Sequence, residues 1–83
     1  MTKSSTFAEL RQLLKDLGFQ ESTFREKFIR FEDDRSDTVF VLPRYQPQDC
    51  VRPVDLLVVR RFLDERGLME ANEFDRFLDK TPA

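Results

Sequence analysis

Residues 27–32 and 38–42 are two runs of aromatic and β-branched side chains, separated by a polar cluster at 33–37. This composition is typical of a β-hairpin, because bulky branched side chains fit a pleated surface and Asp and Ser favour turns. Residues 19–23 predict a weaker first strand, and residues 22–26 turn the chain into the second. A sheet of this size needs a cover over one face, and the sequence on both sides of it has the pattern of helices.

The residues before the strands predict an amphipathic helix that begins near Phe7. Thr6 and Glu9 have the spacing of a capping box, in which each residue bonds a free backbone N–H of the other. Gly18 follows the last apolar residue of the pattern, where a left-handed C-terminal cap is common. Pro53 suits the first turn of a second helix.

The second helix carries apolar residues beyond its inner stripe, namely Val54, Leu57 and Val58. A helix that is apolar over so wide an arc needs a second covering surface. We expect residues 71–80 to form a short third helix that packs beside the second and supplies that surface. The predicted fold class is therefore α+β, a two-layer α-β-β-β-α sandwich with a short C-terminal third helix.

Side chains alternate along a strand, so Ile29 and Phe31 share one face of the second strand and Phe28 and Arg30 share the other. The third strand is apolar on both faces and should end at Pro43, which cannot donate a ladder hydrogen bond. We predict that Phe28 and Phe40 lie on the face without helices, as a patch for a partner or for self-association. The alternatives are a cover of loops, or a register shifted by one residue.

The chain of 83 residues predicts a single domain over 1–83, with frayed ends at 1–5 and 81–83. Its composition is 40% hydrophobic and includes nine Phe, which favours a folded domain over a disordered segment. The single cysteine, Cys50, cannot form an internal disulfide, and no apolar N-terminal run has the length of a signal peptide or membrane span. These features predict a cytoplasmic protein without a membrane segment.

The absence of histidine excludes Ser-His and Cys-His nucleophile pairs, a His general base and a His metal ligand. The acidic cluster of Asp33, Asp34 and Asp37 has the oxygen ligands of a hard-cation site, but it lacks the glycine and the terminal glutamate of a calcium loop. We interpret them as hairpin residues and Cys50 as an incidental thiol. No metal and no cofactor is expected.

A phosphate-contacting or RNA-contacting rim with one stacking aromatic could be formed by Arg25, Lys27, Arg30, Arg44 and Tyr45. The alternative is a solvated strand face on which Glu26 and Glu32 offset the positive charges. A net charge of −2, spread evenly along the chain, argues against strong nucleic-acid binding, which depends on Lys and Arg contacts to phosphates.

Several segments resemble one known family: residues 13–19 at the end of the first helix, Phe31, residues 39–43, residues 63–68 and Phe74. In their order and character they are similar to the HicA family, also called YcfA-like, the small toxins of bacterial toxin–antitoxin pairs. The resemblance implies a fold like that of double-stranded-RNA-binding domains. It also implies mRNA cleavage and neutralisation by a HicB antitoxin.

The family's catalytic element is a Gly-Ser-His or Gly-Gly-His triplet that ends three residues before the second-strand aromatic. The corresponding residues here are Glu26-Lys27-Phe28, and a phenylalanine cannot transfer a proton. We therefore predict a non-catalytic HicA-like module without catalytic residues, which binds a protein partner, such as a HicB-like antitoxin or a second copy, or binds RNA weakly. The alternative is an active HicA-type mRNA-cleaving toxin that uses Lys27, Arg30 and Tyr45 to stabilise the phosphate transition state.

Overall fold

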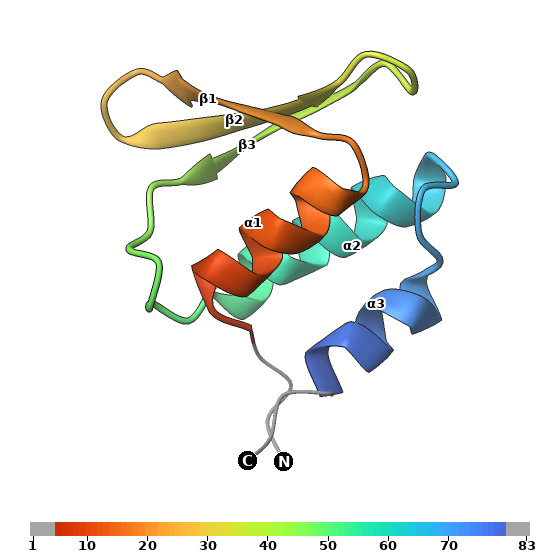
Figure 1. Cartoon of the computed structure of the whole chain (residues 1–83). Coiled ribbons are helices and arrows are strands. Elements are labelled where there is room, and N and C mark those ends of the chain that lie inside the picture. The colour runs from red at the N-terminus through yellow and green to blue at the C-terminus, as the bar shows by residue number, and fades with distance from the viewer. Residues whose placement is uncertain (1–4, 80–83) are drawn as a thin grey trace.

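A computed structural model describes residues 5–79 and contains three helices and one antiparallel sheet (Figure 1). In chain order the elements are α1 (Phe7–Asp16), β1 (Gln20–Phe24), β2 (Phe28–Asp33), β3 (Thr38–Pro43), α2 (Pro53–Glu65) and α3 (Ala71–Asp79). All three helices lie on the same side of the sheet, and α3 lies farther from it than α1 and α2. The predicted α+β fold with an α-β-β-β-α layout and a third helix is confirmed.

The strands pair in the order β1-β2-β3, and their register decides which side chains face the helices. Glu21, Phe31 and Phe40 are paired across the sheet, as are Thr23, Ile29 and Leu42, and paired residues share a face. The predicted alternation in β2 is confirmed, because Ile29 and Phe31 are buried whereas Phe28 is exposed.

The prediction that Phe28 and Phe40 form one exposed patch is wrong. Phe40 is paired with the buried Phe31, so it points to the helix side, where it is 5% exposed and its ring stacks on Phe62 at a centroid distance of 5.5 Å. Phe28 is paired with Pro43 and lies on the opposite face. Val39 and Val41 therefore take the exposed positions of β3, at 45% and 38%.

The N-terminus of α1 is fixed by local and distant contacts. The capping box is present: Thr6 Oγ1 accepts from the Glu9 N–H at 3.2 Å, and Glu9 Oε1 accepts from the Thr6 N–H at 3.0 Å. The first two helical residues, which have no carbonyl partner inside the helix, donate to the loop before α2: Phe7 N–H to the Asp49 carbonyl at 2.8 Å and Ala8 N–H to the Pro47 carbonyl at 3.0 Å.

The prediction of a frayed start fails at Ser5, which is 2% exposed and whose carbonyl accepts from the Val51 N–H at 2.9 Å. The rest of that prediction, residues 1–4 and 81–83, lies outside the described residues.

Helix α3 packs beside α2, as predicted, but covers a different side of it. Arg60 donates to both carboxylate oxygens of Asp75, at 3.0 and 3.2 Å, and Phe74, Phe77 and Leu78 are buried. The helix therefore lies on the Arg60 side of α2. The apolar residues that were expected to be covered stay exposed: Val54 at 62%, Leu57 at 60% and Val58 at 36%.

Candidate functional site

The five residues predicted to contact phosphate do not form one surface. Arg25 and Lys27 lie in the turn between β1 and β2, where the Arg25 guanidinium sits 5.5 Å from the centre of the Phe24 ring. The Lys27 carbonyl accepts from the Arg44 N–H at 2.9 Å, so Lys27 and Arg44 lie at the same end of the sheet. Arg30 lies on the face without helices and pairs with Glu32 at 3.4 Å.

Tyr45 is occupied by structural contacts on the helix side. Its ring lies 5.5 Å from that of Phe7, its hydroxyl donates to Asp55 Oδ2, and the same oxygen accepts from the Arg52 N–H at 3.1 Å. Burial and the hydrogen bond to the Asp55 carboxylate raise the pKa of this phenol above its ordinary value. Tyr45 thus holds the start of α2 against α1.

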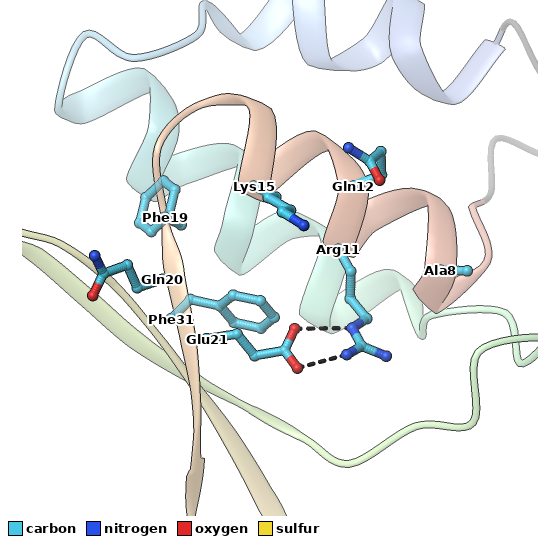
Figure 2. A pocket seen from close by; sticks show the side chains of 8 residues that line it. All are labelled: Ala8, Arg11, Gln12, Lys15, Phe19, Gln20, Glu21 and Phe31. Carbon is cyan, nitrogen blue, oxygen red and sulfur yellow. Dashed lines mark hydrogen bonds and ion pairs between the residues drawn. The ribbon is translucent and has the colours of Figure 1, made fainter.

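Two hollows that share Arg11 and Glu21 lie between α1 and β1. The larger, of about 710 Å³, has Phe19 and Phe31 in its wall, and the smaller, of about 470 Å³, includes Arg44 and Tyr45. Figure 2 shows the Arg11 guanidinium facing the Glu21 carboxylate across this seam, with bonds of 2.9 and 2.6 Å. This ion pair neutralises Arg11, the cation that both hollows share.

Sequence reasoning did not single out Arg11 as a site residue. The helical pattern of residues 7–16 says nothing about what lies opposite Arg11. A signal was present in Gly18, whose φ of +104° lets the chain reverse and run β1 back along α1. That reversal brings Glu21 opposite Arg11.

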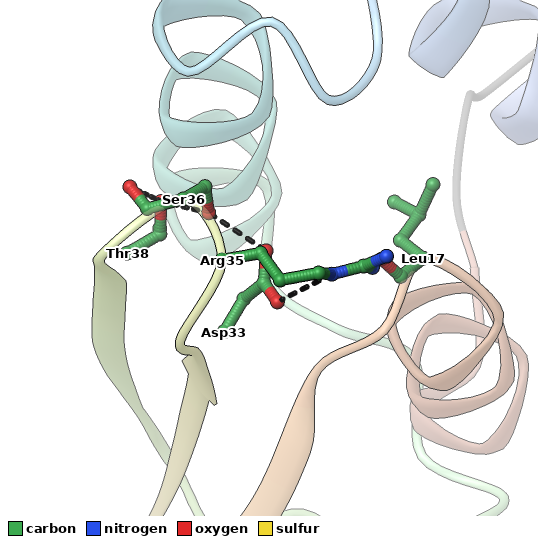
Figure 3. A network of polar contacts seen from close by, with 5 residues as sticks. All are labelled: Leu17, Asp33, Arg35, Ser36 and Thr38. Atoms are coloured by element: carbon green, nitrogen blue, oxygen red, sulfur yellow. Dashed lines mark hydrogen bonds and ion pairs between the residues drawn. The ribbon is translucent and has the colours of Figure 1, made fainter.

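The acidic cluster is a turn, as predicted. Asp33 is 3% exposed, accepts from Ser36 Oγ at 2.7 Å and pairs with Arg35 at 3.6 Å, and Ser36 Oγ also bonds Thr38 Oγ1 (Figure 3). The hydrogen bond from Ser36, helped by the Arg35 charge, lowers the pKa of Asp33. Within residues 5–79 no group of three or more His, Cys, Asp or Glu side chains is placed to hold a metal ion.

The helix-free face is the side of the sheet that none of the three helices described in residues 5–79 covers, as Figure 1 shows. Register and alternation assign it nine residues: Gln20, Ser22, Phe24, Phe28, Arg30, Glu32, Val39, Val41 and Pro43. Four of them are large hydrophobic residues exposed by about two fifths: Phe24, Phe28, Val39 and Val41. The Arg30–Glu32 ion pair lies between the two outer strands. An apolar surface with a neutral ion pair in its centre is better suited to binding a protein than to binding a polyanion such as RNA.

Position 28, where the HicA resemblance would place the catalytic histidine, belongs to this face. Phe28 is the first residue of β2, is 37% exposed and lines neither of the two hollows that share Arg11 and Glu21.

No family model, curated protein or solved structure matches the chain. The case for any function therefore rests on the residues and geometry above. No helix among residues 5–79 is long and apolar enough to cross a membrane.

Proposed function

We propose that this chain is a HicA-like domain without nuclease chemistry, which acts by binding a protein partner through its helix-free face. The observation that carries this proposal is the exposure of Phe24, Phe28, Val39 and Val41 on one side of a sheet whose other side is filled. An exposed apolar patch on one face of a small domain often marks an interaction site.

The charges on the face specify the kind of partner. The charges of Arg30 and Glu32 cancel, and both side chains lie among apolar ones. A partner that fits presents apolar side chains to the two phenylalanines and the two valines, with hydrogen-bonding groups opposite the ion pair. By the resemblance to the HicA family, a HicB-like antitoxin is the partner class that we propose.

Nuclease activity has less support, because the alternative catalytic set does not converge. Arg30 is on the helix-free face, whereas Tyr45 packs on Phe7 on the helix side, with its hydroxyl engaged by Asp55 and Arg52. Residues that stabilise one phosphoryl transition state must point to one place. Cleavage of mixed RNA by the purified protein, abolished by Lys27→Ala, would overturn the binding-only proposal.

The direct test is copurification of this chain with the products of the two neighbouring reading frames, followed by calorimetric titration of the purified pair. Phe28→Asp places a charge between Phe24 and Pro43 on the helix-free face and should weaken the complex by at least about 100-fold, as expected for an aromatic anchor that the partner buries.

The matched control is Val54→Asp, an equally drastic change on exposed α2, which should leave that affinity unchanged. Binding that Phe28→Asp does not weaken, or failure of both neighbouring products to bind, would contradict the proposal.

A further inference from the structure

The outer side of α2 and the free edge of β3 form a second unusual surface, which we call the β3–α2 flank. It comprises Val39, Val41, Val54, Leu57, Val58, Arg61, Phe62 and Glu65. The flank shares Val39 and Val41 with the helix-free face, whereas Phe24 and Phe28 belong to the proposed partner contact alone.

The register shows which backbone groups of β3 are free. The Arg44 N–H donates to the Lys27 carbonyl, so Lys27 and Arg44 form a hydrogen-bonded pair. In an antiparallel ladder such pairs recur at every second residue, so Phe31 and Phe40 also form a hydrogen-bonded pair. The residues between them on β3, Val39 and Val41, therefore direct their N–H and C=O groups away from β2. They form an open edge that can accept another strand.

The two edges of the sheet are protected to different degrees. By the same alternation Glu21 and Thr23 direct their backbone groups to the open side of β1, where the Arg11–Glu21 ion pair lies alongside. That edge is polar and charged, as is usual for edges that stay single. The β3 edge carries Val39 and Val41 instead, with no charged side chain on the strand.

The exposed stripe of α2 lies on the same flank as this edge. Val54, Val58 and Phe62 are spaced four residues apart and so form one row along the helix. Phe62 stacks on Phe40 beneath β3, and the core residues Leu56, Val59 and Leu63 point elsewhere, so the row runs along the β3 side of the molecule. A hollow of about 300 Å³ opens between Val58, Arg61, Phe62 and Glu65.

We propose that this flank binds a second copy of the same chain, as a closed two-fold dimer in which β3 pairs antiparallel with its counterpart. With the axis at Phe40, Val39 of each copy lies opposite Val41 of the other, and each pair exchanges both backbone hydrogen bonds. The result is a continuous six-stranded sheet.

The charges favour a copy as the occupant. Arg61 and Glu65 are the only charged side chains of the flank and sum to zero, so two flanks meet without like-charge repulsion although each chain carries a net charge of −2. Within one copy they pair at 3.0 Å and remain 79% and 56% exposed. In a two-fold arrangement the α2 helices run antiparallel, which places Arg61 of one copy near Glu65 of the other.

The test is sedimentation equilibrium of the whole chain at concentrations from about 1 μM to 1 mM, the range of weak to moderate dimers. We expect a monomer–dimer equilibrium. Val41→Pro removes an N–H that points away from the sheet and should weaken the dimer at least about tenfold without breaking the β2–β3 ladder. Leu57→Lys, at a position 60% exposed, should weaken it similarly without affecting the core.

The matched control is Thr23→Pro, which removes the equivalent outward N–H on the β1 edge and should leave the dimer constant unchanged. A wild-type monomer at the highest concentration overturns the proposal. So does an unlimited series of larger oligomers, or a dimer that only Thr23→Pro disrupts. The Phe28→Asp variant should dimerise normally, which separates this inference from the proposed partner contact.

Discussion

Tyr45 connects three parts of the chain through one side chain. Its ring packs on Phe7 in α1, and its hydroxyl bonds both Asp55 in α2 and the Arg52 N–H at the start of that helix. The pKa of the phenol is raised first by burial and then by the Asp55 carboxylate, because an ionised phenol could not donate to Asp55 and would be repelled by it.

The only tyrosine of a chain without tryptophan can be titrated on its own. We expect the ultraviolet absorbance of the Tyr45 phenolate to rise above about pH 10 in the folded protein and near pH 10 in urea. Because the pKa of Tyr45 is higher in the folded than in the unfolded protein, the stabilisation that its protonated hydroxyl provides is present below about pH 10. It is lost as pH rises through the folded pKa.

The Tyr45→Phe variant keeps the ring and loses both hydrogen bonds, which should lower the free energy of unfolding by about 1–2 kcal/mol. Urea titration of the variant and the wild type measures the difference. A native phenol that titrates at or below the denatured value would contradict this account.

The Asp33 carboxyl should make the free energy of unfolding depend on pH in the opposite direction. Its folded pKa is lowered, mainly by the Ser36 hydrogen bond and then by Arg35, so its contribution is present above the unfolded pKa near 4 and is lost as pH falls through the folded pKa. We expect Asp33→Asn to be less stable than the wild type at pH 7, and the gap to narrow below about pH 4. Urea titrations of both proteins across that range measure the gap. A gap that does not change with pH would show that charge is not the cause.

At the scale of elements, α1 depends on its capping box and on the loop that reaches it from residues 47–49. We expect Thr6→Ala to lower the free energy of unfolding by about 1 kcal/mol, since the Glu9 N–H loses its acceptor. Thermal and urea denaturation measure the loss. Glu9→Gln keeps a side-chain acceptor for the Thr6 N–H and should cost little. No loss in Thr6→Ala would argue that the helix start is held by the loop alone.

Sequence patterns within short segments predicted the helices and strands correctly, but they could not predict the contacts between these elements. The Thr6 and Glu9 pattern and the alternation in β2 are properties of short segments, and both are confirmed. The side on which Phe40 lies could not be read from β3, because both faces of that strand are apolar. Its pairing with Phe31 decides the matter, and pairing is set by the whole sheet.

The candidate site shows the same division. Position 28 was placed on the correct face by alternation alone. The Arg11–Glu21 pair and the exposure of Leu57 were not predicted, because each depends on where a distant element packs: β1 against α1, and α3 on the Arg60 side of α2.

At the scale of the whole molecule, the distribution of charge determines how strongly the domain can hold RNA. Three cations, Arg25, Lys27 and Arg44, lie at one end of the sheet. Arg11 is paired with Glu21 beside β1, and Arg30 is paired with Glu32 on the helix-free face. Among the described residues, an RNA strand bound at this end of the sheet meets the three cations Arg25, Lys27 and Arg44, which limits the number of counterions that binding there releases.

We expect fluorescence anisotropy with single- and double-stranded RNA to give a plot of log affinity against log salt no steeper than about −3, because each phosphate contact contributes a little less than one unit. Lys27→Ala and Arg44→Ala should each flatten the slope by about one unit. Arg30→Ala is the matched control and should leave it unchanged, since Arg30 faces the other side. Steep dependence with submicromolar affinity at physiological salt would require a basic surface that this arrangement of charges does not provide, and the partner contact would then cease to be the better account of the domain.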